Sequence, residues 1–236
     1  MKEKMVCYTA IFGGKDDLLD PPGASDDCDF VCFTDDPSIE SKIYDVRLCK
    51  RLFSDPTRDA RRYKLLPHLF LPDYKYSLWI DGCVTLNPVN LDEFRNQLSD
   101  GTDIILFKHP VRDCVYDEVK ACISLKKDSP RTMLKQVEKY RREGYPSHNG
   151  LCVSTIMFRR HMSPALIKFD EAWWEEVCKY SRRDQLSFNY LTWKYNLPYE
   201  TFSGKGEIRD NVYCKWGIHK IKDSWRKPWF KLLMRH

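Results

Sequence analysis

Short apolar runs alternate with longer amphipathic segments along most of the chain. Runs with the composition of buried strands lie at residues 5–12, 29–34, 43–48, 78–80, 103–107, 151–158 and 199–202. Segments with helical character lie at residues 54–69, 90–98, 115–127, 130–143, 163–180 and 183–195. Strands that alternate with helices predict an α/β fold whose largely parallel sheet is covered on both faces.

Capping residues and prolines predict where the helices begin and end. Ser54 and Asp55 precede Pro56, a helix start in which a cap residue stands before an early proline. Pro67 is expected to kink or restart this helix, because proline breaks the backbone hydrogen bonding. Gly144 is expected to end the helix over residues 130–143.

Composition then limits the class of protein. The chain has 236 residues, 42% hydrophobic and 31% charged, with a net charge of +5, which fits one globular domain with a full core. No apolar run approaches the roughly 20 residues that span a bilayer, and we expect no signal peptide at the charged start. The modest charge allows an anionic partner, but scattered basic residues without a recognised motif argue against a nucleic acid.

Ten cysteines are many for this length. None forms a Cys-X-X-Cys pair, and no cysteine–histidine set has the spacing of a zinc site. Several lie inside apolar runs, for example Cys7, Cys32 and Cys152, where a free thiol behaves as a small hydrophobe. We therefore expect reduced cysteines and a cytoplasmic protein, with the inner face of a membrane as one location; the alternative is a luminal domain of a secretory-pathway protein.

Residues 74–86 carry the most information about function. The apolar run 78–80 leads directly into Asp81 and Gly82. Glycine lets the backbone turn or approach a ligand closely, and open α/β sheets bind ligands at the carboxyl ends of their strands. Asp81 is therefore the first candidate functional residue, and the alternative is an aspartate that merely opens a turn.

Six short motifs follow one another along the chain. They are Tyr8-Thr9-Ala10-Ile11-Phe12-Gly13-Gly14, Asp29-Phe30-Val31-Cys32-Phe33-Thr34-Asp35, Arg58 to Lys64 with Pro67-His68, Trp79-Ile80-Asp81-Gly82, His109-Pro110 with Arg112, and Arg183-Asp184-Gln185-Leu186-Ser187-Phe188. With these motifs the chain resembles the TOD/MUCI-type glycosyltransferase family, once catalogued as a domain of unknown function, over residues 5–195. The resemblance implies a GT-A-like, Rossmann-related fold: a mostly parallel central sheet flanked by helices in a single domain.

In the GT-A fold the ends of the first two strands hold the nucleoside of the sugar donor. The resemblance places this role on Thr9, Ala10 and Phe12 of the first strand and on Asp35 after the second. For Thr9 and Phe12, packing within the strand is an equally open interpretation. For Asp35 the alternative is a turn role.

Many GT-A enzymes bind a divalent metal through an Asp-X-Asp motif, and this chain departs from that pattern. Gly82 and Cys83 follow Asp81. A single carboxylate supplies few ligands for a hard divalent ion, which prefers several oxygens. Two outcomes stay open. Either Mn²⁺ or Mg²⁺ is held by Asp81, the diphosphate, water and a distant residue, for which His219 is the candidate, or cationic side chains neutralise the diphosphate instead.

A basic helix precedes the strand that leads to Asp81. Helical spacing puts Arg58 and Arg61 on one face, with Lys64 one turn further. Arginine pairs bidentately with phosphate, and a leaving diphosphate needs its developing charge stabilised. These three residues, together with Asp81 and Gly82, are therefore predicted to bind the donor; the alternative is a solvated basic face.

Asp184 and Gln185 begin a predicted helix and are candidates for the reacting end of the site. Asp184 could deprotonate an acceptor hydroxyl in an inverting transfer, bind sugar hydroxyls or position a retained configuration. The alternative is a carboxylate that the helix dipole favours at this position. Asp81 and Asp184 are the predicted catalytic residues, and His109, Arg112 and Gln185 are predicted to meet the acceptor.

Residues 215–236 mix lysine and arginine with tryptophan, phenylalanine and leucine. Basic and aromatic side chains suit a membrane interface, which would fit a lipid-linked glycan acceptor; the alternative is a tail packed on the domain. We therefore divide the chain into a glycosyltransferase domain at 1–214 and a tail at 215–236.

The sequence thus predicts a transferase that moves a hexosyl or related sugar from a nucleotide-sugar, first of all a UDP-sugar, to a glycan acceptor in polysaccharide biosynthesis. The missing second carboxylate motivates one alternative, a nucleotide-sugar-binding module without catalytic activity.

Overall fold

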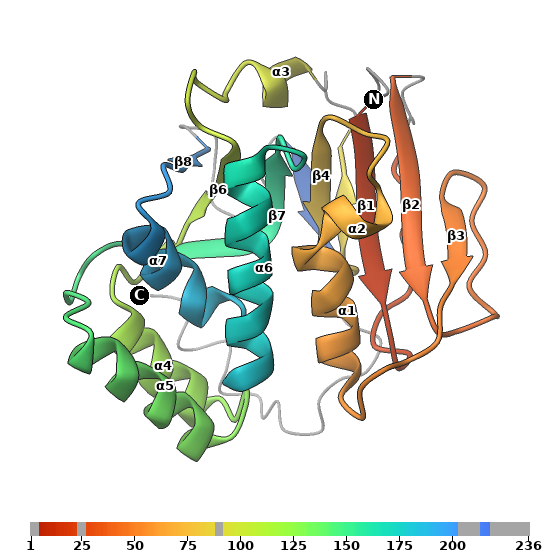
Figure 1. Cartoon of the computed structure of the whole chain (residues 1–236). Helices are drawn as coiled ribbons and strands as arrows, with labels where there is room; N and C mark the ends of the chain where they lie inside the picture. The colour runs from red at the N-terminus through yellow and green to blue at the C-terminus, as the bar shows by residue number, and fades with distance from the viewer. Residues whose placement is uncertain (1–4, 23–26, 88–91, 203–212, 218–236) are drawn as a thin grey trace.

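The fold is known from a computed structural model that describes residues 5–22, 27–87, 92–202 and 213–217. Its centre is a seven-stranded sheet in the order β3-β2-β1-β4-β7-β6-β8 (Figure 1). The bounds are β1 Met5–Ile11, β2 Cys28–Thr34, β3 Asp45–Leu48, β4 Ser77–Ile80, β6 Ile104–Lys108, β7 Cys152–Arg159 and β8 Glu200–Thr201. Only β7 runs against its two neighbours, β4 and β6. The predicted class, a mostly parallel central sheet flanked by helices, is confirmed.

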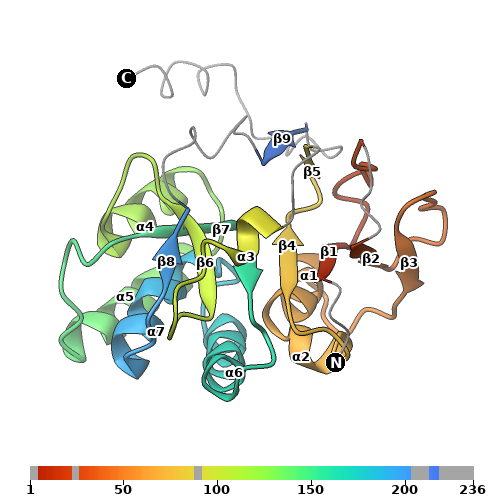
Figure 2. The same cartoon turned by 90° about the horizontal axis from the view of Figure 1, so that it is seen from above.

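Seven helices accompany this sheet in the described part of the chain. They are α1 Pro56–Leu65, α2 Pro67–Phe70, α3 Asp92–Arg95, α4 Val115–Ser124, α5 Pro130–Arg142, α6 Pro164–Lys179 and α7 Gln185–Tyr195. The predicted strands and helices all appear, with ends that differ by a few residues. Helices α1, α2 and α6 lie along one face of the sheet (Figures 1 and 2).

Local sequence explains how α1 begins and ends. The Asp55 side chain accepts a hydrogen bond from the backbone N–H of Thr57 at 3.0 Å, and Pro56 occupies the first turn, so the helix start has both a cap and a preset backbone. Leu66 leaves the helical conformation and Pro67 opens α2. The predicted restart at Pro67 is confirmed.

Two cores lie on opposite faces of the sheet because strand side chains alternate between faces. Tyr8 and Trp79 belong to the core under the helices, whereas Cys7 and Leu78 belong to the second core. The second core is covered by Phe94 of α3 and by a small two-stranded sheet.

The small sheet pairs segments that lie far apart in sequence. Strand β5, Val84–Leu86, runs antiparallel to β9, Cys214–Trp216, and the Gly217 N–H donates to the Cys83 carbonyl at 2.6 Å. This sheet was not predicted, and β9 crosses the expected boundary at residue 214. Residues 218–236 lie outside the described residues, so the role of the tail stays a prediction. In the described residues we find no helix with the length and apolar character needed to cross a membrane.

The ends of several strands meet at one edge of the sheet. Strands β1, β2 and β4 are parallel, so their carboxyl ends meet at that edge, and the antiparallel β7 begins there. Open α/β sheets bind ligands at this edge, which is where Asp81 follows β4.

Candidate functional site

A cavity of about 410 Å³ lies at this edge of the sheet. Its wall comes from the end of β1 and the loop after it, the start of α1, the end of β4, the turn before α5 and the segment before α7. The lining residues are Ala10, Ile11, Phe12, Gly13, Lys15, Asp16, Pro56, Thr57, Ala60, Arg61, Trp79, Asp81, Gly82, Lys127, Arg182 and Arg183. Of the predicted donor-binding residues, the cavity thus brings together Ala10, Phe12, Arg61, Asp81 and Gly82.

The cavity wall is strongly cationic. Five lysine and arginine side chains line it against two carboxylates, a surplus of three positive charges. Four of the cations, Lys15, Lys127, Arg182 and Arg183, were not predicted. The adjacent arginines directly before Asp184 were a visible signal for two of them, whereas Lys15 and Lys127 lie in loops without a recognisable pattern.

Asp81 lies in this wall with one oxygen already engaged. Its Oδ1 accepts a hydrogen bond from Trp79 Nε1 at 2.9 Å and lies 3.3 Å from Lys64 Nζ. The same oxygen is 3.9 Å from Arg61 Nη1. Two cationic side chains therefore stand beside the carboxylate that follows β4.

Asp184 is buried beside the same cations. Its Oδ1 lies 3.0 Å from Arg61 Nε, and its Oδ2 lies 2.7 Å from Lys64 Nζ. The hydroxyl of Ser154, near the start of β7, donates to Oδ2 at 2.8 Å and accepts from Lys64 at 3.1 Å. Burial alone would raise the pKa of Asp184, but Arg61 and Lys64 outweigh it and hold the pKa well below its usual range. The carboxylate is therefore ionised at neutral pH.

The two cations respond differently to this environment. Burial and the neighbouring Arg61 lower the pKa of Lys64, although Asp184 and Asp81 favour its charged form. Burial works against the charge of Arg61 too, yet Asp184 and Asp81 prevail and raise its pKa. The four side chains form one cluster of two cations and two anions. Lys64 and Asp184 are its buried half, whereas Asp81 and Arg61 are partly exposed and line the cavity.

Gly82 is placed where a side chain would not fit. A Cβ atom there would lie 2.9 Å from Ile11 Cγ1 and 3.3 Å from Asp16 Oδ2. The close approach explains a glycine directly after Asp81, and it places the second carboxylate of the wall, Asp16, next to the Asp81–Gly82 corner.

The remaining predicted donor residues lie around the cavity and are not part of its wall. Asp35 accepts a hydrogen bond from the Gly13 N–H at 2.8 Å, so it holds the loop after β1. Thr9 is buried on the strand face opposite Ala10, and its hydroxyl makes no hydrogen bond within the described residues.

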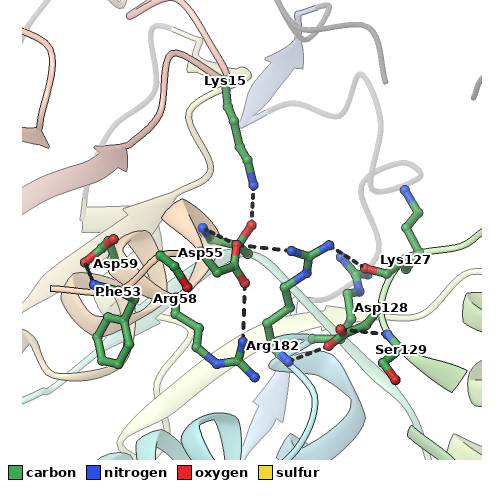
Figure 3. Close-up of polar contacts among 12 residues, drawn as sticks. Lys15, Phe53, Asp55, Arg58, Asp59, Lys127, Asp128, Ser129 and Arg182 are labelled. Atoms are coloured by element: carbon green, nitrogen blue, oxygen red, sulfur yellow. Dashed lines mark hydrogen bonds and ion pairs between the residues drawn. The ribbon is translucent and has the colours of Figure 1, made fainter. Parts of the chain in front are cut away.

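Arg58 belongs to a polar network that joins α1 to two loops (Figure 3). It donates to the Tyr180 carbonyl at 2.9 Å and lies 3.4 Å from Asp55. Arg182 pairs with the other Asp55 oxygen at 3.1 Å and donates to the Lys127 carbonyl at 3.1 Å. Lys15 contacts the Thr57 hydroxyl.

Asp128 completes this network and fixes the position of the Arg182 backbone. Its Oδ2 accepts from the Arg182 N–H at 2.9 Å and from the Ser181 hydroxyl at 2.8 Å. The start of α1, the turn before α5 and the segment before α7 are thereby held together around the cavity (Figure 3).

Two of the predicted acceptor residues, His109 and Arg112, lie after β6, and the third, Gln185, begins α7. Arg112 Nε lies 2.6 Å from Glu118, and His109 Nδ1 accepts from the Arg112 N–H at 2.9 Å. Burial lowers the pKa of His109, despite the opposing charge of Glu118. Gln185 receives Arg183 Nη2 on its Oε1 at 3.1 Å, and its buried Nε2 makes no hydrogen bond within the described residues. Arg183, which lines the cavity, links the two regions.

The predicted metal ligands are only partly visible. His219 lies outside the described residues. Among the described residues, one group of three ligand types stands within metal-binding reach, Cys114, Asp117 and His148, and none of the three lines the cavity. The cations Lys64 and Arg61 lie beside Asp81, so the surroundings of this carboxylate favour an anionic ligand over a divalent metal ion.

Comparisons with known proteins agree with the motifs. A model of the TOD1/MUCI70 glycosyltransferase-like domain matches residues 1–205. The chain belongs to this family. "Probable hexosyltransferase MUCI70" of Arabidopsis thaliana is 29% identical over 147 residues, which are 58% of this chain and 25% of that protein. The chain therefore matches about a quarter of the length of this curated TOD1/MUCI70 relative.

A solved structure also matches this TOD1/MUCI70 domain. It is described as the crystal structure of a glycosyltransferase involved in the glycosylation of the major capsid of PBCV-1. The identity is 11%, the TM-score is 0.38, and the match covers 68% of this chain and 65% of that chain.

Proposed function

We propose that this domain is a glycosyltransferase that moves a hexosyl or related group from a nucleotide-sugar to a glycan hydroxyl. A UDP-sugar is the first donor to test. The observation that carries the proposal is the cationic cavity with Asp81 in its wall, at the carboxyl edge of the sheet of a TOD1/MUCI70-family domain.

The reaction places clear demands on such a cavity. The bond between the sugar anomeric carbon and the diphosphate oxygen breaks, and the nucleoside diphosphate leaves with the electron pair. The acceptor oxygen forms the new bond and gives up its proton to a base. The charge that develops on the leaving diphosphate must be stabilised, and five cationic side chains in one wall suit that task.

The cavity wall and its immediate surroundings suggest roles for several of the predicted donor-binding residues. Ala10 and Phe12 are proposed to contact the nucleoside, and Asp81 and Gly82 the sugar diphosphate. Asp35 would act through Gly13, whose N–H it binds. Arg58 would act through Asp55 and the segment near Tyr180.

For Asp184 the contacts support a role at the reacting end through charge and position. A carboxylate whose pKa is held low is a weak base, but it keeps Arg61 and Lys64 oriented next to Asp81. Asp184 is proposed to fix these cations while the donor bond breaks.

The acceptor is proposed to be a glycan or a lipid-linked glycan that approaches from the side of His109, Arg112 and Gln185. Arg183 supports this direction, since it lines the cavity and binds Gln185. Peripheral membrane contact through the tail and a cytoplasmic location are part of the same proposal. Eight cysteines buried as single thiols support a reducing compartment.

Binding and transfer can be tested separately. A ligand that binds only the native state raises the apparent melting temperature, so a thermal-shift panel of nucleotide-sugars identifies the donor. Release of the nucleoside diphosphate then reports transfer or donor hydrolysis. Asp81→Asn should abolish this release, with the exposed Arg131→Met as a control that leaves it unchanged. If Asp81→Asn released the nucleoside diphosphate as fast as the wild type does, the assignment of Asp81 to the donor site would be wrong.

A second candidate function is nucleotide-sugar binding without catalysis. The single carboxylate in the sequence Asp81-Gly82-Cys83 favours it. A nucleotide-sugar that shifts the melting temperature but is neither transferred to varied acceptors nor hydrolysed would support this function.

A further inference from the structure

We propose that side-chain cations alone bind and neutralise the diphosphate of the donor. Lys64 and Arg61, which lie beside the Asp81 carboxylate, take the place of a divalent metal there. This inference rests on the proposed function, because it concerns how the same cavity holds the donor. Lys127, Arg182 and Arg183 are proposed to bind the diphosphate as well, and we call these three residues the diphosphate clamp.

The contacts of Asp81 are the first observation. Its Oδ1 is shared by the Trp79 indole N–H at 2.9 Å and the Lys64 ammonium at 3.3 Å, and Arg61 stands 3.9 Å away. A divalent ion on this carboxylate would lie close to two positive charges, which repel it. It would also find a donor set short of the several oxygens that a hard ion prefers.

Lys64 is fixed in this position. Its side chain is 1% exposed, and Asp184 at 2.7 Å and Ser154 at 3.1 Å hold the ammonium on the other side. The ammonium therefore keeps its place beside Asp81 without a bound ligand, so a positive charge is present at the corner where β4 ends.

The cationic wall is the second observation. Lys15, Lys127, Arg182 and Arg183 line the cavity in addition to Arg61. Asp55 and the Lys127 carbonyl hold the Arg182 guanidinium at 3.1 Å each. Arg183 donates through Nη2 to the Gln185 Oε1 at 3.1 Å, which holds its guanidinium at the wall. Guanidinium groups pair well with phosphate oxygens.

The position of Asp16 favours the opposite interpretation, in which the cavity binds a divalent metal. It is the second carboxylate of the described wall, and its Oδ2 lies next to the Gly82 corner. If a metal were bound, Asp16 and Asp81 would be its protein ligands at this edge, so the experiment includes Asp16→Asn.

The experiment measures UDP binding to the full chain by calorimetry, in EDTA and again with MnCl₂. Equal affinity in the two buffers supports the inference. The variants Lys127→Met and Arg182→Met should each weaken UDP binding about tenfold in EDTA, the usual effect of losing a charge-assisted contact. Arg131→Met, an exposed arginine on α5, is the matched control and should bind as the wild type does.

Other results would overturn it. UDP binding that appears only with Mn²⁺ and is lost in Asp16→Asn and Asp81→Asn would establish a metal site and leave the proposed function in place. Unchanged affinity in both Lys127→Met and Arg182→Met would remove the clamp. If neither UDP nor pyrophosphate binds in either buffer, the inference and the proposed function both fail.

Lys64 is tested by Mn²⁺ binding, measured by electron paramagnetic resonance. Lys64→Met removes the positive charge beside Asp81, and we expect it to bind Mn²⁺ more tightly than the wild type. Tight Mn²⁺ binding by the wild type would overturn the inference. Because Lys64 is buried, circular dichroism must first show that the variant folds; if it does not, the wild-type Mn²⁺ titration and the Lys127→Met result decide the question.

Discussion

The ammonium of Lys64 lies 2.7 Å from the carboxylate of Asp184, and neither side chain is more than 2% exposed. A buried ion pair of this kind gives little net stability over an apolar pair, but losing one partner is costly because the other charge stays buried. The pair is therefore a sensitive point of the fold as well as part of the candidate site.

Replacing Asp184 by asparagine should destabilise the protein strongly. Arg61 and Lys64 would both lose the carboxylate that lies within 3.0 Å of them. Breaking a buried pair in this way costs about 3–5 kcal/mol. Urea denaturation at neutral pH measures the loss, and a variant within 1 kcal/mol of wild type would contradict the picture of a fully engaged carboxylate.

The stability lost in Asp184→Asn should depend on pH. The Asp184 pKa is lower in the folded state than the ordinary value of about 4, so its contribution is present above that pH and is lost as the pH falls through the folded pKa. The stability difference between wild type and Asp184→Asn should therefore shrink below about pH 4. A difference that stays constant from neutral to strongly acidic pH would assign the effect to packing alone.

Asp170 should behave in the opposite way. Burial raises its pKa to about 7, against the lowering effect of Arg159 at 3.2 Å. The folded state then holds a proton that the unfolded state releases at about pH 4, so this contribution is present below that pH and is lost as the pH rises towards 7. Asp170→Asn should flatten that slope, and denaturation curves at several pH values test it. A wild-type slope that survives the substitution would rule out Asp170 as its source.

Ser154→Ala should have a smaller effect at the same cluster. The hydroxyl donates to Asp184 and accepts from Lys64, and its loss leaves two buried charged groups each short of a partner, at a cost of about 1–3 kcal/mol. Ser124→Ala is a matched control, because that serine is exposed and bonds only the carbonyl one turn earlier. Equal stability of the two variants would show that Ser154 does not support the cluster.

The thiols offer a test that needs no ligand. None of the ten cysteines forms a disulfide; Cys178 is exposed, Cys49 is partly buried and eight are buried. In the native protein a thiol reagent should react first with Cys178, and all ten should react after denaturation without a reducing agent. Cys178→Ser should remove the fast phase. Fewer than ten thiols in the denatured protein would mean that disulfides form.

Local patterns in the sequence were enough to predict the main sheet and the helices. The strand before Asp81 and the restart at Pro67 depend on nearby residues, so periodicity and proline chemistry reveal them. The pairing of β5 with β9 depends on contacts between residues 84 and 216, which no local pattern encodes.

The site was predictable to the extent that its residues follow strands or sit in motifs. Asp81, Arg61 and Lys64 do, and the structure brings them together with Asp184. Lys127 reaches the same cavity because Arg182 joins the turn before α5 to the start of α1 (Figure 3). The burial of Asp184 likewise arises from packing, which helical spacing does not reveal.

The β5–β9 pair has a practical consequence for shortened versions of the protein. The family match ends at residue 205, yet Tyr213 and Cys214 belong to the second core, and β9 supplies the hydrogen-bonding partner of β5. A chain cut at 205 would leave β5 with unpaired backbone groups at an apolar surface, the kind of open edge that promotes aggregation. Soluble fragments for crystallisation or for display should therefore extend through Gly217.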